Sequence, residues 1–269
     1  STSGDIFLSR RGDKLAFWNS TSGLQLRKFY ARDITSEAFL PDVARLVGSI
    51  RNNAVMAWDV ASGESTLWND HIDVRQHEAF PSGTRMLSWG DPLEIHDAGL
   101  GRWRNARIAV VWDAVTREVL CNLSGHTNTI YLGRGFPAGD KALTAAADRG
   151  LTSAGGMAGS GVCAIVWELR TCTEVRRFLH SDWVHDVAVL AGGTKVATIS
   201  GSRSAENHVL YFWCVLSGER RQLAVATRLA SFPGLVAIPR GELVAVADKY
   251  SSSRGTIIVA DARSASVRY

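Results

Sequence analysis

The chain has 269 residues, of which 46% are hydrophobic, and its 30 Lys and Arg against 26 Asp and Glu give a formal net charge of +4. This length and apolar content suffice for several small hydrophobic cores. No run of 18 apolar residues occurs, which argues against a membrane-spanning helix. The excess of positive charge is small, so its placement is more informative than its total.

One short pattern recurs along the chain: an apolar run that ends in Trp, followed by Asp or a substitute and a tight turn. The copies, in chain order, are KLAFWNSTSG, AVMAWDVASGE, RIAVVWDAVT, CAIVWELRTC, VLYFWCVLSG and TIIVADARS. A second motif, a Pro- or Gly-containing turn, precedes the last five copies as AFLPD, AFPSG, GFPAG, LAGG and AIPRG. Each unit therefore predicts four strands, with units ending near residues 30, 70, 124, 180, 226 and 269.

These features resemble the WD40 β-propeller family over nearly the whole chain. The resemblance rests on Trp58-Asp59, Trp112-Asp113, the Gly125-His126 pair and the stretch HSDWVHDVAVLAGG that begins at His180. It implies an all-β fold of four-stranded antiparallel blades, six of them visible, in a single domain spanning residues 1–269. The other repeats are degenerate, with Asn19, Glu168 or Cys214 after the Trp and Ala260 in place of it.

The resemblance also implies a buried hydrogen-bond network in the fourth unit. The His, Ser/Thr, Asp and Trp of the family's network correspond here to His126, Thr144, Asp148 and Trp167. Such a network ties a loop to two strands, so we interpret these four residues as structural and not as a catalytic set.

The first unit begins with what should be the second strand of a blade, and its innermost strand has no visible sequence. Propellers of this family commonly close with seven blades, and an unclosed ring leaves sheet edges unpaired. We therefore expect a fragment of a longer chain that forms part of a seven-bladed ring; a closed six-bladed ring is the alternative.

Insertions between the second and third strands of the units fall, in the propeller layout, on one face, where binding residues commonly concentrate. These loops and the neighbouring connections carry cations and two Trp residues that we expect to contact an acidic ligand: Arg10, Arg11, Arg51, Arg102, Trp103, Arg104, Arg149, Trp183, Arg203 and Arg254. Cations around one mouth focus the electric field on an anion. The alternative is that these arginines are ordinary solvated loop residues.

The sequence shows no nucleophile with a partnered base and no metal-ligand spacing, so we expect a non-enzymatic protein without a metal or cofactor. The first hypothesis is an interaction scaffold, or a subunit of a multi-subunit complex, that binds an acidic or phosphorylated protein through the insertion-bearing face. The alternatives are a propeller that binds a polyanion, either nucleic acid or phosphoinositide, and a regulatory sensor propeller of an NTPase switch protein.

Cysteine usage bears on the compartment. Cys121, Cys163, Cys172 and Cys214 form no CxxC pair and lie in or beside predicted strands. We interpret them as reduced, buried side chains, which favours an intracellular and specifically a cytoplasmic location.

Overall fold

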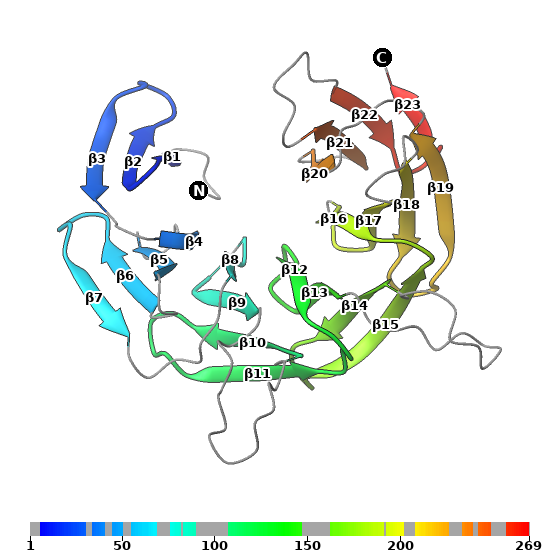
Figure 1. Ribbon diagram of the computed structural model, residues 1–269, viewed down its shortest axis with the longest axis horizontal. Coiled ribbons are helices and arrows are strands. Elements are labelled where there is room, and N and C mark those ends of the chain that lie inside the picture. The colour runs from blue at the N-terminus through cyan, green and yellow to red at the C-terminus, as the bar shows by residue number, and fades with distance from the viewer. Residues whose placement is uncertain are drawn as a thin grey trace, which may run out of the picture. The chain divides into compact units, whose positions relative to one another are not determined.

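The computed structural model describes residues 6–30, 34–40, 45–50, 55–68, 76–81, 83–89, 107–146, 162–190, 192–201, 208–225, 233–238, 242–248 and 257–268. These residues form 23 strands and no helix, and the strands pair into six antiparallel sheets (Figure 1). The chain divides into two compact units, residues 1–124 and 125–269, with three of the sheets in each.

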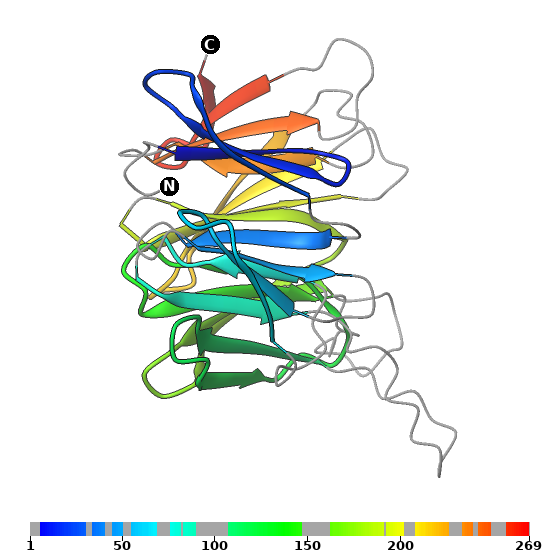
Figure 2. The same ribbon diagram turned by 90° about the vertical axis from the view of Figure 1, so that its left-hand side faces the viewer.

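The first unit contains one three-stranded and two four-stranded sheets, which lie stacked on one another in Figure 2. Its strands are β1 (Ile6–Arg11), β2 (Lys14–Asn19), β3 (Gln25–Tyr30), β4 (Ile34–Leu40), β5 (Arg45–Ile50), β6 (Val55–Asp59), β7 (Ser65–Trp68), β8 (Gln76–Ala79), β9 (Arg85–Trp89), β10 (Ile108–Asp113) and β11 (Val119–Ser124). The sheets are β1–β3, β4–β7 and β8–β11, and the first strands of the last two, β4 and β8, lie side by side.

The second unit contains three four-stranded sheets: β12–β15, β16–β19 and β20–β23. Its strands are β12 (Ile130–Gly135), β13 (Lys141–Ala146), β14 (Val162–Glu168), β15 (Thr173–His180), β16 (Val184–Val189), β17 (Lys195–Ser200), β18 (His208–Cys214), β19 (Arg220–Val225), β20 (Pro233–Ala237), β21 (Leu243–Asp248), β22 (Ile257–Asp261) and β23 (Ser266–Arg268). Strand β16 lies between β12 and β20, so the first strands of the three sheets are neighbours.

The sheets of each unit pack face to face, which explains the apolar runs in the sequence. Phe17 of β2 packs with Leu46 and Trp58 of the next sheet, and Phe178 of β15 packs with Trp213 of the next sheet at a ring-centroid distance of 4.8 Å. Because a middle strand is covered on both faces, it reads as a continuous apolar run and not as an alternating one. Each such side chain stabilises the fold by roughly 1.5 to 3 kcal/mol when fully buried.

The turn that follows each Trp-containing strand has a common geometry. The side chains of Asn19, Asp59, Asp113 and Asp261 accept hydrogen bonds from backbone N–H groups two or three residues later. One residue of each turn adopts a positive φ, and it is Gly23, Gly63, Arg117, Cys172, Gly218 or Ala265. Glycine is therefore favoured in these turns but not required, which is why the Ser-Gly signature is present in only some copies.

The repeated antiparallel sheets confirm the all-β, blade-like part of the sequence prediction. The first sheet has three strands where the other five have four, and β1 corresponds to the second strand of a complete sheet. The innermost strand of the first sequence repeat, which ends near residue 30, is thus not among the described residues, in keeping with the sequence expectation. Closure into a six- or seven-bladed ring stays a prediction.

The interpretation of the cysteines is wrong for two of the four. Cys163 and Cys214 form no disulfide, whereas Cys121 and Cys172 are disulfide-bonded. A bridge that involves no CxxC spacing leaves no signature from which it can be inferred in one sequence. Because disulfides persist mainly in oxidising compartments, the cysteines no longer support an intracellular location.

Candidate functional site

The predicted network of the fourth unit has three members among the described residues. His126 Nε2 lies 2.8 Å from Thr144 Oγ1, and Trp167 Nε1 donates to the same oxygen at 2.7 Å. All three side chains are buried. A Cβ on Gly125 would lie 3.0 Å from the Trp167 ring, so glycine before His126 lets the loop approach the indole. The fourth predicted member, Asp148, lies outside the described residues.

The Trp-to-hydroxyl hydrogen bond recurs in other sheets. Trp18, Trp112 and Trp213 donate to Ser9, Ser88 and Thr198 at 2.7, 2.7 and 3.0 Å. Sheet β4–β7 has Gly48 at the hydroxyl position, where a Cβ would lie 2.8 Å from Ile34 Cδ1. The last sheet has Val246 there and Ala260 in place of Trp, so both members of the pair are replaced together.

Two buried polar residues that sequence reasoning missed connect neighbouring sheets. His77 on β8 lies between Ser49 of β5 and Ser88 of β9, with ring nitrogen to oxygen distances of 2.6 and 2.7 Å. Asp186 on β16 pairs with Arg134 of β12 at 3.2 Å and accepts the backbone N–H of Leu235 on β20 at 3.0 Å. Both residues hold sheets together within a unit, and their only sequence signal is a polar residue at a buried strand position.

Three of the ten predicted binding residues are described. Arg10 is engaged with the adjacent sheet, since it donates to Glu37 Oε2 at 2.8 Å and to the Ile34 carbonyl at 2.6 Å. Arg11 is exposed at the end of β1. Trp183 is half-buried, with its ring 6.0 Å from that of Tyr131. The others, Arg51, Arg102, Trp103, Arg104, Arg149, Arg203 and Arg254, lie outside the described residues, so the predicted set stays a prediction.

Oppositely charged residues face each other in several sheets, at the start of the second strand and the end of the third. The first residue of the second strand stands across from the residue that follows the Trp, giving the pairs Arg45–Asp59, Arg85–Asp113, Lys141–Glu168 and Lys195–Cys214. In the first three pairs a cation faces a carboxylate. In the fourth, Lys195 faces a thiol, so the carboxylate that would neutralise it locally is missing.

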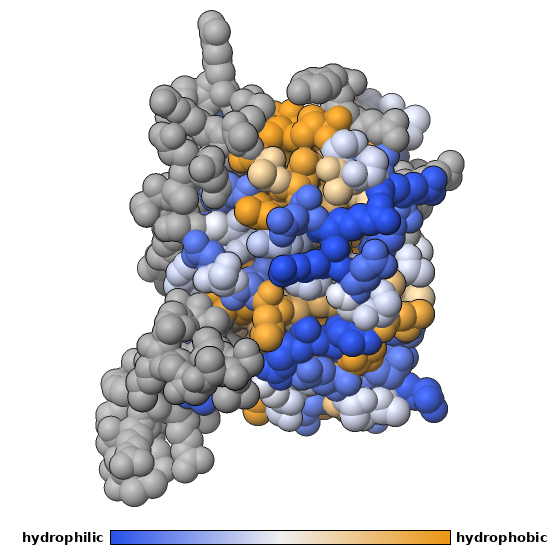
Figure 3. Space-filling view, turned by 90° about the vertical axis from the view of Figure 1, so that its right-hand side faces the viewer, coloured by the Kyte–Doolittle hydropathy of each residue, from blue (hydrophilic) through white to orange (hydrophobic). Residues whose placement is uncertain are grey.

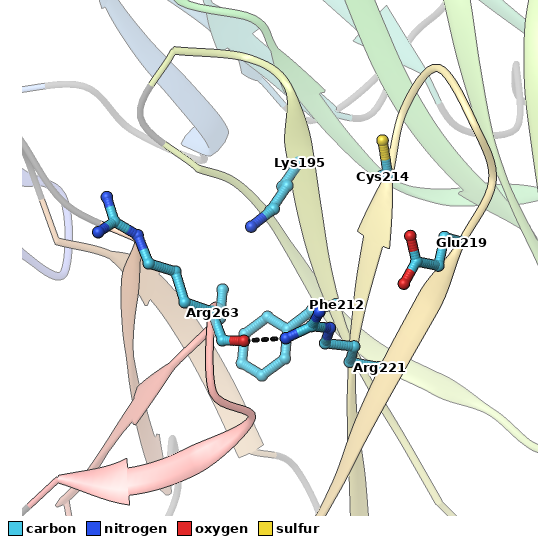
Figure 4. A pocket seen from close by; sticks show the side chains of 7 residues that line it. Lys195, Phe212, Cys214, Glu219, Arg221 and Arg263 are labelled. Atoms are coloured by element: carbon cyan, nitrogen blue, oxygen red, sulfur yellow. Dashed lines mark hydrogen bonds between the residues drawn. The ribbon is translucent and has the colours of Figure 1, made fainter.

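A pocket of about 310 Å³ lies beside Lys195, between sheets β16–β19 and β20–β23 of the second unit (Figure 4). Its lining residues are Lys195, Phe212, Cys214, Glu219, Arg221, Ala262 and Arg263. Phe212 and Ala262 are buried and form an apolar floor, while the three cations and Glu219 supply charge. The pocket lies at the Lys195–Cys214 end of β17 and β18, opposite the end at which these strands flank the segment that contains Arg203, one of the predicted binding residues.

The three cations of the pocket each have a polar partner but keep donors to spare, and the Arg263 side chain is 79% exposed. Lys195 Nζ donates to Glu242 Oε2 at 2.6 Å, and Arg263 Nε lies 3.5 Å from the same oxygen. Arg221 donates one N–H to the carbonyl of Arg263, as the dashed line in Figure 4 shows. An ammonium has three N–H donors and a guanidinium five, so most donors of the three groups remain for a ligand.

Cys214 occupies the turn position that carboxylates hold elsewhere. A hydrogen bond with the Ser217 hydroxyl, followed by one with the Ser217 backbone, lowers the pKa of the Cys214 thiol. The pKa of Asp59 is lowered in the same way by the backbone and hydroxyl of Ser62. The thiol therefore replaces the capping function of the carboxylate in the turn without replacing its charge opposite Lys195.

Hydrophilic residues predominate on the side of the second unit shown in Figure 3, with apolar areas between them. No group of three or more His, Cys, Asp or Glu in the described part of the chain is arranged to hold a metal ion. Within the same residues there is no helix long and apolar enough to cross a membrane.

Neither a family model nor a curated protein sequence matches the chain.

Proposed function

We propose that this protein is a non-enzymatic binding protein, an interaction platform that holds an acidic segment of a partner protein in the pocket between β16–β19 and β20–β23. The single observation that carries the proposal is the cluster of Lys195, Arg221 and Arg263 around an apolar floor. Cations with spare N–H donors recognise carboxylate or phosphate oxygens through charge-assisted hydrogen bonds. The volume of about 310 Å³ is at the lower end of the range for ligand pockets, which suits one side chain better than a large molecule.

The proposal keeps the partner class expected from the sequence and moves the site to the opposite end of the strands. The pocket forms where one sheet lacks the carboxylate that stands opposite the equivalent cation in three other sheets. The repeated sheets fit a propeller-like fold, and we further propose that they are blades of a closed ring of the WD40 kind. A rigid array of this type suits a scaffold within a larger complex.

A polyanion such as nucleic acid is a weaker fit to the described residues. Binding of nucleic acid relies on several phosphate contacts along a tract of cations. Here Glu219 lines the pocket and Glu242 bridges two of its cations, so the positive charge is local and partly neutralised. A partner with one well-placed anionic side chain fits this arrangement better.

The experiment is binding of the purified protein to an array of equal-length acidic, neutral and basic peptides, with single-stranded nucleic acid and phosphoinositide vesicles as further probes. Wild type should retain acidic peptides. A Lys195→Gln, Arg221→Gln double variant should lose at least about tenfold in affinity, which corresponds to 1.4 kcal/mol. An Arg107→Gln, Arg170→Gln variant is the matched control, because it removes the same charge from exposed positions elsewhere.

Two results contradict the proposal. One is equal retention of acidic peptides by wild type and by the Lys195→Gln, Arg221→Gln variant, which would make the pocket an ordinary surface. The other is retention of nucleic acid or vesicles alone, with loss at moderate salt, which would favour the polyanion function.

A further inference from the structure

Glu242 is the residue that sets the charge of the pocket without lining it. It precedes β21, and its backbone carbonyl accepts the N–H of Ala262 at 2.7 Å, which fixes it beside the β22–β23 turn. One of its carboxylate oxygens, Oε2, receives Lys195 Nζ at 2.6 Å and lies 3.5 Å from Arg263 Nε. A single oxygen thus joins a cation of sheet β16–β19 to a cation of sheet β20–β23.

The formal charge around the pocket is small once Glu242 is included. Lys195, Arg221 and Arg263 contribute three positive charges, and Glu219 and Glu242 contribute two negative ones, with Cys214 counted as a thiol. Among the described residues this leaves one positive charge. Without Glu242 the same group would carry two.

We propose that the pocket selects a carboxylate over a phosphate, and that Glu242 is the residue that determines this specificity; this inference rests on the proposed function above. A carboxylate carries one negative charge and matches the remaining positive charge of the pocket. A phosphorylated side chain carries about −1.5 to −2 charges at neutral pH. Its second charge would lie near Glu219 and Glu242, and juxtaposed like charges disfavour the wrong partner.

The same geometry gives Glu242 a second role as a positioning residue. Because Oε2 holds both Lys195 Nζ and Arg263 Nε, the two cations are drawn together on one side of the pocket. Arg221 is held next to Arg263 by its hydrogen bond to the Arg263 carbonyl. Lys195 and Arg221 each have a hydrogen-bond partner before a ligand arrives, which reduces the entropy lost on binding, whereas the Arg263 side chain is 79% exposed.

The test compares four N-terminally blocked peptides of one sequence that differ at the central residue or at the C-terminus. Three are C-terminally amidated and carry Glu, phosphoserine or Gln at the centre, and the fourth carries the central Gln with a free C-terminal carboxylate. Affinities are measured by NMR titration, which follows weak binding, for wild type and for Glu242→Gln, Glu242→Asp and Thr194→Asp variants. Wild type should bind the Glu peptide at least about fivefold more tightly than the phosphoserine peptide, a difference near 1 kcal/mol.

The variants give the direction of each expected change. Glu242→Gln should raise the affinity for phosphoserine about tenfold and reverse the preference, whereas Glu242→Asp keeps the charge and should keep the preference. Thr194 precedes Lys195 and is exposed, as Asp140 precedes Lys141 in the neighbouring sheet. Thr194→Asp should therefore weaken binding of both anionic peptides. The free C-terminal carboxylate shows which source of carboxylate the pocket prefers.

The outcomes separate this inference from the proposed function. Tighter binding of phosphoserine by wild type, with a ratio that Glu242→Gln leaves unchanged, overturns the specificity and leaves the acidic-partner function standing. Absence of binding for every anionic peptide overturns both. If Glu242→Gln lowers the thermal stability, the affinities are compared at a temperature at which it and wild type are both folded, and Glu242→Asp is the control that keeps the charge of residue 242.

Discussion

Two neighbouring sheets of the second unit differ in how they neutralise the lysine that begins their second strand. In sheet β12–β15, Lys141 pairs with Asp140 and lies 3.6 Å from Glu168, and the hydrogen bond with Asp140 is the largest cause of its raised pKa. In sheet β16–β19 the equivalent neighbours of Lys195 are Thr194 and Cys214, neither a carboxylate. Lys195 therefore reaches Glu242 of the next sheet, and the space beside it is the pocket. The difference teaches that losing one carboxylate at a repeated position turns a structural cation into a candidate binding group.

Two buried histidines of the second unit differ in their surroundings. His126 shares the Thr144 hydroxyl with Trp167, whereas neither ring nitrogen of the buried His180 has a hydrogen-bond partner. His180 instead packs against the rings of Tyr211 and Trp213 at centroid distances of 5.2 and 5.4 Å. His126, which precedes β12, thus takes part in a hydrogen-bond network, whereas His180, the last residue of β15, packs against aromatic rings of β18.

The largest expected effect comes from removing the shared hydroxyl. Thr144→Val leaves Trp167 Nε1 and His126 without their partner, and each unsatisfied buried group costs about 1 to 3 kcal/mol, so we expect a loss of about 4 kcal/mol. Thr198→Val in the next sheet affects Trp213 alone and should cost about 2 kcal/mol. Urea unfolding of the two variants measures the difference, and equal losses would contradict the comparison of the two networks.

The next effect is on the pH dependence of stability. Burial, with a smaller contribution from Arg220, lowers the pKa of His180 to about 4. The unfolded chain, with an ordinary His pKa near 6.5, binds the proton more readily, so stability is unaffected above about pH 6.5 and falls between pH 6.5 and 4. The loss should approach about 3 kcal/mol and level off below pH 4.

The control for this prediction is His180→Phe, which keeps an aromatic ring and removes the titrating group. Stability of the variant should have a flatter slope between pH 6.5 and 4 than that of wild type, whatever its absolute value. Parallel slopes for the two proteins would show that His180 does not titrate as a buried, unpartnered side chain.

The smallest expected effect on stability is the loss of either lysine. Lys141→Met and Lys195→Met each remove partly exposed ion pairs, which are worth about 0.5 kcal/mol after solvent screening. Only Lys195→Met should weaken binding of acidic peptides. Thermal unfolding and peptide binding measured on the same samples separate the two roles, and an equal loss of binding in both variants would contradict the assignment of the site.

The sequence predicted much of the fold because the repeated signals are local. Apolar runs ending at Trp58 or Trp112, and turns with Pro or Gly, identify strands without knowledge of what they pack against. The three described strands of the first sheet were predictable for the same reason. The pairing of His77 with Ser49 was not, because it joins residues of two sheets whose register depends on packing.

The candidate site was predicted less well than the fold. The sequence analysis predicted ten binding residues, mostly loop arginines. Seven of the ten lie outside the described part of the chain. It recorded Cys214 as a degenerate repeat position and as a reduced, buried cysteine, but not as part of a site. The signal for the site is the residue that faces one cation across two strands, since Arg45, Arg85 and Lys141 each face a carboxylate and Lys195 does not. Reading it required the cross-strand register, which the sequence alone does not provide.

The measurement that tests the central claim most directly is peptide binding by Cys214→Asp, with Cys214→Ser as the control. Aspartate at this position should cap the turn as Asp59 does and pair with Lys195 as Glu168 pairs with Lys141. The account predicts that Cys214→Asp binds the Glu peptide about tenfold more weakly than wild type, while Cys214→Ser binds it as wild type does. Unchanged affinity in a folded Cys214→Asp variant would contradict the claim that the missing carboxylate creates the site.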